Sequence, residues 1–249
     1  MQTSIPSTAT ALKSLLRADL TTQWRNRRSM ILILLVPVII LYSWRPLVDK
    51  FGAAYILSSA ITIGLVAIGL MGYSNSIARD REKGVFQRLR VAPVPRWSIM
   101  VSRLLVQLAM ILLLVVFVYV GGYYFDHVTI SASGYVVTLF TALISGALYL
   151  SIGQIIVGML KNPETVNATS RMVYFIFIFV GMLGQFGQLG EQVKTITEWS
   201  PYGVVRNILA GGMDISHWTH DTTLALLATI GYTIVFAVIG IRNFKWSIK

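Results

Sequence analysis

Few side chains in this sequence are placed for acid–base, nucleophilic or metal chemistry. The chain has no cysteine, which excludes a thiolate metal site, a cysteine nucleophile and a disulfide framework. Two histidines three residues apart could share a helical face around a divalent ion, but no spacing fixes a third ligand. We therefore expect no metal at the group that contains them: Asp214, His217, His220 and Asp221.

The sequence also lacks G-x-x-x-x-G-K-[ST], the loop that cradles nucleotide phosphates. If ATP drives this protein, ATP and Mg²⁺ must bind to a separate polypeptide. The long apolar stretches contain no ionisable residue, whereas ion-coupled carriers and intramembrane hydrolases need such groups at membrane depth. The chain is therefore predicted to be neither an enzyme nor a secondary transporter.

The composition indicates a protein whose main solvent is lipid. Of its 249 residues 55% are hydrophobic and 12% are charged, and the mean hydropathy is +0.68. A helix that crosses a hydrocarbon core of about 30 Å needs about 20 apolar residues. We predict an all-α integral membrane protein, one domain over residues 1–249, with six transmembrane helices. Their approximate bounds are 29–44, 51–74, 104–125, 134–160, 172–190 and 223–241.

Basic residues predict the orientation of these helices, because Lys and Arg collect in cytoplasmic loops. The loops on one side hold only four of the 21 basic residues, namely Arg45, Lys50, Lys194 and Arg206. The other 17 lie in the opposite loops and in both terminal segments. We predict cytoplasmic termini in a multi-pass protein of a prokaryotic plasma membrane. The net charge of +11 then reflects lipid headgroups and topology, not nucleic acid.

Residues 8–28 predict an interfacial helix on the cytoplasmic surface of the membrane. They hold no apolar run long enough for a signal-peptide core, so the first span is expected to be an uncleaved anchor, kinked at Pro37. Apolar side chains recur every four residues along the interfacial helix: Leu12, Leu16, Leu20 and Trp24.

The loop between the second and third spans carries the string RDREKGVFQRLRVAPV at residues 79–94. Its first part, 77–89, mixes charges of both signs with apolar residues, which is typical of a short helix that stands in water and docks on a partner. Gly84 permits a turn, and the prolines at 93 and 95 force an extended break before the third span. We therefore predict that this loop is rigid and acts as a lever.

This string resembles the cytoplasmic signature of the ABC-2 family of ABC exporter permeases, in which E-[KR]-G-[TV]-[FL]-[EQ]-x-L precedes a threonine- or alanine-proline pair. Two further strings resemble the family: WRNRRSMILILLVPVII at 24–40 and WSPYGVVRNILAGG at 199–212. The predicted fifth span departs from the family, because it lacks the proline that members commonly place there.

The resemblance implies a transporter half without its own ATPase. Two copies of this chain would assemble with two copies of a separate ABC ATPase subunit, whose ATP-driven closure would push on the loop. The residues that the resemblance assigns to ATPase docking are Arg79, Asp80, Arg81, Glu82, Lys83, Gly84, Phe86 and Leu89.

The segment between the fifth and sixth spans predicts two short external helices that dip into the outer leaflet. Ser200 can cap the second helix with Pro201 in its first turn, and Gly211 and Gly212 would end it. The resemblance to the family implies that this segment is a lid over the exit. The residues that it would include here are Trp199, Pro201 and Tyr202.

We predict the permease subunit of an exporter that moves an apolar or amphipathic substrate, such as a drug or a lipid, out of the cytoplasm or inner leaflet. Multidrug resistance is one expected outcome. The predicted pathway residues are Ser58, Thr62, Phe175, Phe179 and Met182, although the aromatic stripe also fits plain helix packing. Three alternatives stay open: polysaccharide or glycolipid export, a membrane enzyme acting on lipid headgroups, and a regulatory protein without flux.

Overall fold

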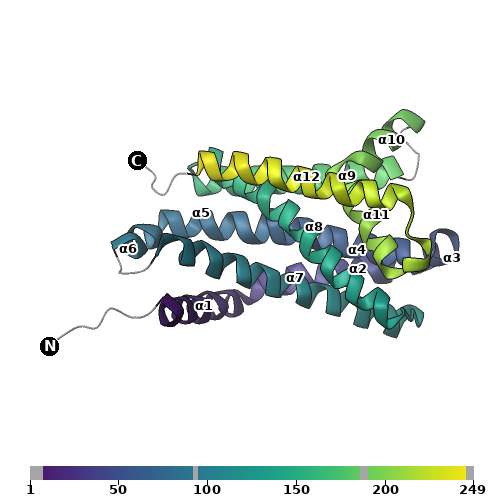
Figure 1. The fold of residues 1–249 in the computed structure, drawn as a ribbon, viewed down its shortest axis with the longest axis horizontal. Coiled ribbons are helices and arrows are strands. Elements are labelled where there is room, and N and C mark those ends of the chain that lie inside the picture. Colours follow the sequence, from purple (N-terminus) through teal and green to yellow (C-terminus); the bar gives the residue numbers. More distant parts are fainter. Residues whose placement is uncertain (1–7, 92–94, 186–189, 245–249) are drawn as a thin grey trace.

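The computed structural model describes residues 8–91, 95–185 and 190–244, and all regular elements in these ranges are helices. The helices run along one common axis, back and forth, to form an elongated bundle (Figure 1). The prediction of an all-α membrane protein is confirmed. In chain order the elements are α1 (Thr8–Arg25), α2 (Arg27–Ser43), η1 (Arg45–Leu47), α3 (Val48–Phe51), α4 (Ala53–Val66), η2 (Ala67–Tyr73), α5 (Ser74–Glu82), α6 (Val85–Val91), α7 (Arg96–Asp126), α8 (Ala132–Met159), α9 (Pro163–Gln185), α10 (Glu191–Trp199), α11 (Pro201–Met213), η3 (Ile215–His217) and α12 (His220–Asn243).

Five helices in the described ranges are long and apolar enough to cross a membrane. They are Ala53–Glu82, Ser98–Asp126, Ala132–Met159, Pro163–Gly184 and His220–Asn243. The helix α2, with 17 residues, is shorter but also apolar and lies against α4 and α7. It occupies the place of the first predicted span, and the count of six crossings stays a prediction.

The helices extend beyond the predicted spans at one end of the bundle. The predicted second span stops at 74, whereas α4, η2 and α5 form one helix that continues to Glu82. Likewise α7 and α9 begin at Arg96 and Pro163, well before 104 and 172. Hydropathy marks only the part of a helix that suits lipid, while backbone hydrogen bonds carry the same helix on through polar residues.

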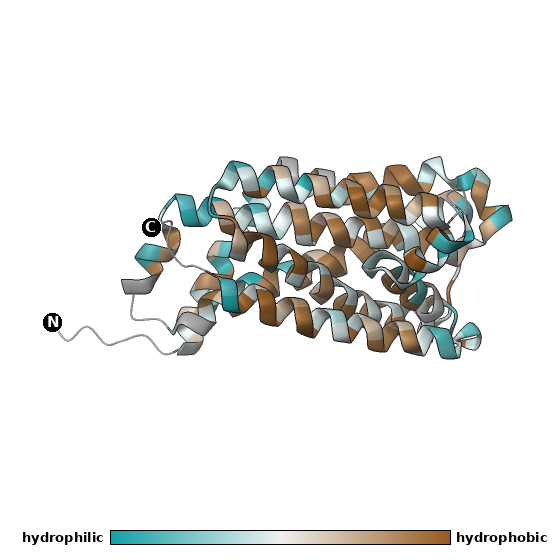
Figure 2. Cartoon of the chain, turned by 90° about the horizontal axis from the view of Figure 1, so that it is seen from above, coloured by the Kyte–Doolittle hydropathy of each residue, from teal (hydrophilic) through white to brown (hydrophobic). Residues whose placement is uncertain are grey.

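Polar residues gather at the two ends of the bundle and apolar residues form the band between them, as expected for a membrane protein (Figure 2). We call the end that holds α6 the inner end and the end that holds α10 the outer end. The helix α1 lies at the inner end beside α7, and α12 finishes at the same end. The inner end corresponds to the predicted cytoplasmic side.

The continuous helix α4–η2–α5 forms the centre of the bundle. Every side chain from Ile56 to Leu70 is buried, and α2, α7, α8 and α11 pack around it. Its middle part, η2, is a π-helix, a wider form in which the backbone hydrogen bonds skip one residue more than in an α-helix. The central helix therefore touches protein on all sides.

Glycine allows η2 and α8 to meet backbone to backbone. A Cβ added at Gly153 would overlap the carbonyl oxygen of Gly69, and a Cβ at Gly69 would lie 2.5 Å from the carbonyl carbon of Tyr149. Lipid gives no hydrophobic drive for helices to associate, so such close approach and the dispersion contacts that it permits hold membrane helices together. This crossing is the tightest contact of the central helix.

Replacing Gly153 with alanine should destabilise the protein by about 1–3 kcal/mol, because the overlapping atom belongs to backbone that cannot rotate away. The matched control is Gly231→Ala on α12, where nothing lies within 4 Å of the new methyl group, and we expect no loss of stability there. Thermal unfolding of both variants in one detergent measures the difference. Equal midpoints would contradict the packing described here.

Candidate ATPase-coupling site and outer helices

The predicted docking string begins on a transmembrane helix and turns at Gly84. The N–H of Lys83 donates to the Arg79 carbonyl at 3.0 Å, and the N–H of Gly84 donates to the Arg81 carbonyl at 3.1 Å. Gly84 has a φ of +65°, in the left-handed region where glycine is favoured, and α6 starts directly after it. The turn predicted at Gly84 is confirmed, whereas residues 92–94 of the predicted break lie outside the described residues.

Arg81 points into the protein and closes the end of α8. Its side chain is 2% exposed and donates from Nη1 to the Leu160 carbonyl at 3.1 Å and from Nη2 to the Val157 carbonyl. These carbonyls belong to the last turn of a helix, where no further N–H of the helix can reach them. The guanidinium thus satisfies two acceptors that the membrane interior could not.

The ring of Phe244 continues this contact to the end of α12. The Arg81 guanidinium lies 5.5 Å from the centre of that ring, and the Phe86 ring meets its edge with 6.2 Å between centres. Phe86 is 1% exposed, so α6 is anchored by it against the bundle. Three helix ends and α6 are therefore fixed in one cluster.

Arg103 on α7 forms a second anchor with two carboxylates. Its Nη1 lies 2.5 Å from Asp80 Oδ2 and its Nε lies 3.3 Å from Asp19 Oδ1, while the Ser102 hydroxyl donates to Asp19 at 2.6 Å. All three charged side chains are between 12% and 16% exposed. The ion triad ties α1 and α5 to the start of α7.

Burial raises the pKa of the Asp19 carboxyl, and this effect exceeds the opposing effects of Arg103 and the Ser102 hydroxyl. A carboxyl whose pKa is higher in the folded state stabilises the fold at acid pH, below the pKa of the unfolded chain. That stability is lost as the pH rises through the folded pKa. Asp19 therefore specifies the position of α1 more than it stabilises the fold above that pKa.

The structure divides the predicted docking residues into two groups. Asp80, Arg81 and Phe86 face the bundle, and Leu89 is half-buried. The sequence prediction that the whole string stands in water is therefore wrong for these positions, because α5 continues as a helix and turns them inward. The exposed predicted residues are Arg79, Glu82 and Lys83, and Gly84 is half-buried. Arg88, which was not among the predicted docking residues, is exposed beside them.

The predicted external helices are present as α10 and α11. The Ser200 hydroxyl accepts the N–H of Gly203 at 3.3 Å, with Pro201 as the first helical residue, so the predicted cap is confirmed. The predicted end at Gly211 and Gly212 is wrong, because α11 continues to Met213. Both glycines instead allow close packing, against Thr222 and Thr141 respectively.

The helix α11 is inserted between other helices. It contacts α4, α8 and α12, and the Tyr202 ring fills the space where a Cβ of Gly181 on α9 would lie. Tyr202 is 1% exposed, and the Pro201 carbonyl accepts the Tyr149 hydroxyl at 3.0 Å. Of the three predicted lid residues only Trp199, 44% exposed, lies at the surface. The sequence does not reveal this insertion, since an amphipathic helix has the same residue pattern whether its apolar face contacts lipid or protein.

The structure does not gather the predicted pathway residues. Ser58 and Thr62 are fully buried on α4, and each hydroxyl donates to a backbone carbonyl one turn earlier. Phe175 and Phe179 are 56% and 62% exposed on the outside of α9. With Met182 they remain predicted pathway residues, but buried α4 hydroxyls and an outer α9 face can line one route only if another chain or a movement joins them.

An apolar cavity of about 660 Å³ lies elsewhere, towards the inner end between α7, α8 and α12. At its wall the Tyr73 hydroxyl donates to Gln154 Oε1 at 2.6 Å. Sequence reasoning missed this cavity, because no residue type marks a gap between helices. Its lining includes Met100, Leu104, Leu108, Leu150, Thr233 and Ile241.

The group of acids and histidines near residue 214 forms a short turn. Asp214 accepts the Ser216 hydroxyl at 2.5 Å, and His217 Nδ1 lies 2.7 Å from its other oxygen. The Ser216 hydrogen bond, followed by that of His217, lowers the pKa of Asp214. Within the described residues no set of three side chains could hold a metal ion.

A bundle of apolar helices with polar ends defines the class of this chain as a multi-pass, all-α membrane protein. A family model described as ABC-2 type transporter matches residues 10–213. The chain therefore belongs to the ABC-2 type transporter family, as the strings at 24–40, 79–94 and 199–212 indicate. Such a domain is the transmembrane component of a transporter and lacks the ATPase site. No curated protein matches the sequence.

We predict that the loss of Arg103 from the ion triad lowers stability more than the loss of the Asp19 charge does. Arg103→Gln leaves Asp19 and Asp80 facing each other without their cation and should cost about 2–3 kcal/mol of stability at pH 7. Asp19→Asn removes the carboxylate that burial disfavours and should cost less than about 1 kcal/mol. Thermal unfolding from pH 4 to 8 measures both. A larger loss for Asp19→Asn than for Arg103→Gln would contradict the account of the triad.

Proposed function

We propose that this chain is the permease subunit of an ATP-driven ABC exporter. Two copies assemble with two copies of a separate ATPase subunit, which binds ATP and Mg²⁺. The ATPase docks on the exposed inner-end surface formed by Arg79, Glu82, Lys83 and Arg88, which we call the docking surface. The inner end is the cytoplasmic side, so both termini lie in the cytoplasm of a prokaryotic cell.

One observation carries this proposal: the docking surface is exposed but firmly attached to the spans. Glu82 ends the central helix, Arg88 donates to the Lys83 carbonyl at 3.0 Å, and the clusters around Arg81 and Arg103 join this segment to α7, α8 and α12. A push on an exposed charged surface without such anchors would only bend a loop. Here the same push reaches the helices, as coupling to ATP hydrolysis requires.

The apolar cavity supports an apolar or amphipathic substrate, such as a drug-like molecule or a lipid. Its volume of about 660 Å³ lies within the usual range of roughly 300–1,000 Å³ for small-molecule sites. The pair Tyr73 and Gln154 offers polar contacts to a mostly hydrocarbon ligand. In this proposal export runs from the cytoplasm or inner leaflet, and resistance to drugs is one expected phenotype.

The exposed face of α9 supports a second copy of the chain as its neighbour. Four of its apolar side chains are more than half exposed and a fifth, Val180, is 44% exposed, and several on α12 are also more than half exposed. A half-transporter needs a partner to enclose a route, and two-fold symmetry is the commonest solution. In a dimer across α9, the predicted pathway residues Phe175 and Phe179 would face the axis. The exposed α9 side chains are Met172, Phe175, Ile176, Phe179 and Val180.

The direct test is reconstitution with the ABC ATPase encoded beside this chain. The two subunits are coexpressed, purified through a tag on the ATPase and placed in liposomes. ATP-dependent movement of fluorescent dyes and lipids across the bilayer would support export of an amphipathic substrate. Movement of a glycolipid alone would favour the saccharide alternative, and purification of the ATPase without this chain would refute the assignment.

The docking surface generates a mutational prediction. Reversing the charge of exposed Glu82 with Glu82→Lys should reduce copurification of the ATPase by about tenfold, equivalent to about 1.4 kcal/mol. Thermal stability should not change, because the Glu82 carboxylate makes no ion pair within the described residues. The control, Glu164→Lys, reverses another exposed glutamate, on the first turn of α9, and should leave copurification intact. The same loss in both variants would indicate a general charge effect.

The cavity generates a second prediction. Leu108→Trp places a large ring in the cavity and should lower ATP-driven transport by about tenfold, while the ATPase still copurifies. Val116→Trp is the matched control on the same helix, since Val116 is 50% exposed and does not line the cavity. Vesicle transport and ATPase activity are measured for both variants. Full transport by Leu108→Trp would remove the cavity from the route.

A further inference from the structure

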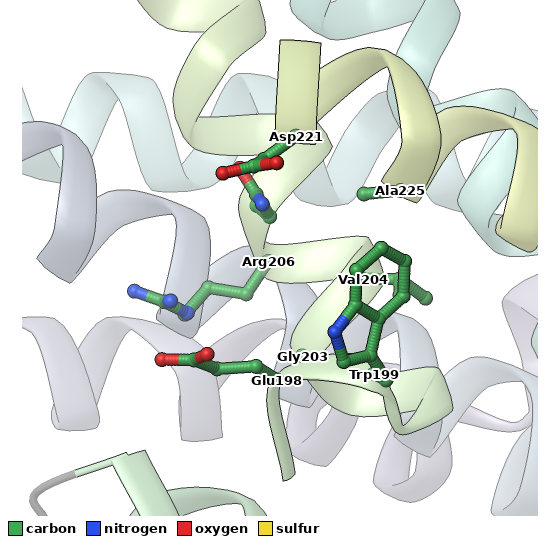
Figure 3. A pocket seen from close by; sticks show the side chains of 8 residues that line it. Glu198, Trp199, Gly203, Val204, Arg206, Asp221 and Ala225 are labelled. Carbon is green, nitrogen blue, oxygen red and sulfur yellow. The ribbon is translucent and has the colours of Figure 1, made fainter. Parts of the chain in front are cut away.

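A polar cavity at the outer end lies far along the chain from the docking surface. Its volume is about 400 Å³, and it opens between α10, α11 and the start of α12 (Figure 3). The side chains around it carry two carboxylates, one guanidinium, one amide and one indole. The lining residues with such groups are Glu198, Trp199, Arg206, Asn207 and Asp221.

Arg206 contributes a cation whose hydrogen-bonding capacity is not used up. Its guanidinium lies 4.5 Å from the centre of the Tyr55 ring on α4, which stabilises the charge through the ring face. Its Nε is buried and donates to no acceptor within the described residues. Burial lowers the pKa of Arg206, and this effect exceeds the opposing effect of the nearby Glu198 carboxylate, which does not reach ion-pair distance. A buried donor of this kind is costly unless a ligand or water accepts its proton.

The carboxylates and the indole of the cavity suit a positive group, and the Glu198 carboxylate lies beside the Arg206 side chain (Figure 3). Glu198 and Asp221 are both exposed and carry negative charge, and the Trp199 indole stands opposite the Glu198 and Arg206 side chains (Figure 3). An ammonium group can pair with a carboxylate and also bind over an indole ring. Asn207 accepts the Thr222 hydroxyl at 3.2 Å, which orients its amide at the cavity. The cavity thus holds one positive site and one negative site side by side.

The cavity lies at the depth of lipid headgroups. Asp221 belongs to the first turn of α12, one of the helices long enough to cross a membrane. Tryptophans concentrate at the boundary between lipid and water, and Trp199 lines the cavity. Further along the face of α12 that carries Asp221 and Ala225, Val235 and Ile239 are exposed, and acyl chains could lie on them.

We propose that this cavity binds the zwitterionic headgroup of a phospholipid, with its phosphate on Arg206 and its ammonium between Glu198, Asp221 and the Trp199 ring. A purely anionic headgroup would meet the two carboxylates, and a purely cationic ligand would meet Arg206. A headgroup with both charges satisfies both sites. The site goes beyond the proposed function, and only its assignment to the outer leaflet rests on the proposed orientation.

The test compares lipids that differ in headgroup alone. The full chain, purified in dodecylmaltoside micelles, is mixed with dioleoyl phosphatidylethanolamine, dioleoyl phosphatidylglycerol or dioleoylglycerol, and bound lipid is counted by native mass spectrometry. We expect phosphatidylethanolamine to bind about tenfold more tightly than phosphatidylglycerol, which lacks the ammonium contact, and more tightly still than dioleoylglycerol, which lacks both charged contacts. The assay needs neither ATP nor transport, so failure of the exporter proposal would not affect it.

Variants test which residues bind the ammonium and which bind the phosphate of the headgroup. Glu198→Gln with Asp221→Asn should abolish the preference for phosphatidylethanolamine over phosphatidylglycerol, because the ammonium loses its partners. Arg206→Gln should abolish the preference for phosphatidylglycerol over dioleoylglycerol and reduce that for phosphatidylethanolamine, which keeps its ammonium contacts. The matched control is Glu191→Gln, an exposed carboxylate of α10 outside the cavity, which should retain the preference. Because the preference is a ratio, partial loss of folded protein does not change it.

Three results would overturn the proposal. Equal binding of the three lipids by the unmodified chain would show ordinary lipid contact, and tighter binding of phosphatidylglycerol would show a simple anion site. Retained preference in the double carboxylate variant would place the headgroup elsewhere. Displacement of bound lipid by soluble maltotetraose at millimolar concentration would show a saccharide site instead.

Discussion

The Arg81 guanidinium determines how the inner end of this protein is built. It donates to two carbonyls at the end of α8, and it also meets the Phe244 ring at the end of α12. Helix ends near lipid must satisfy their carbonyls within the protein, because no water reaches them there. One residue thus meets this requirement for α8 and joins three helices, and the orientation of α6 follows through Phe86.

The ion triad around Arg103 adds to this cluster without duplicating it. Arg81 joins helices of the bundle to one another, whereas Arg103 joins the bundle to α1 through Asp19 and to the central helix through Asp80. Partly buried ion pairs contribute little net stability but specify geometry, since any other arrangement leaves a charge without its partner. The helix α1 is therefore held by a specific polar contact and not by its apolar face alone.

The sequence predicts an all-α membrane protein because the signal of apolar helices is length and composition, and it predicts the Ser200 cap because capping depends on local residue types. It cannot predict which way Arg81 and Asp80 point, since that depends on whether the helix continues beyond residue 74. The sequence cannot distinguish the two roles of Gly211 and Gly212, because glycine occurs both at the ends of helices and where another helix packs closely. In the sequence Arg206 is only one of four basic residues on the predicted external side. Its position at a cavity arises from the insertion of α11 between α4 and α12.

The central helix connects the two polar sites of this protein. Tyr55, whose ring faces the Arg206 guanidinium, lies in the first turn of α4, and Arg81 lies in the last turn of α5 on the same 30-residue helix. At 1.5 Å per residue that helix is about 45 Å long. Its two ends must move together unless the helix deforms, and the π-helical segment in its middle is pinned to α8 where Gly69 meets Gly153. A tilt about that crossing, driven from the docking surface, would displace Tyr55 in the opposite direction. The Arg206 guanidinium, which contacts the Tyr55 ring, would shift with it. The outer cavity and the proposed docking surface would then be connected through the central helix.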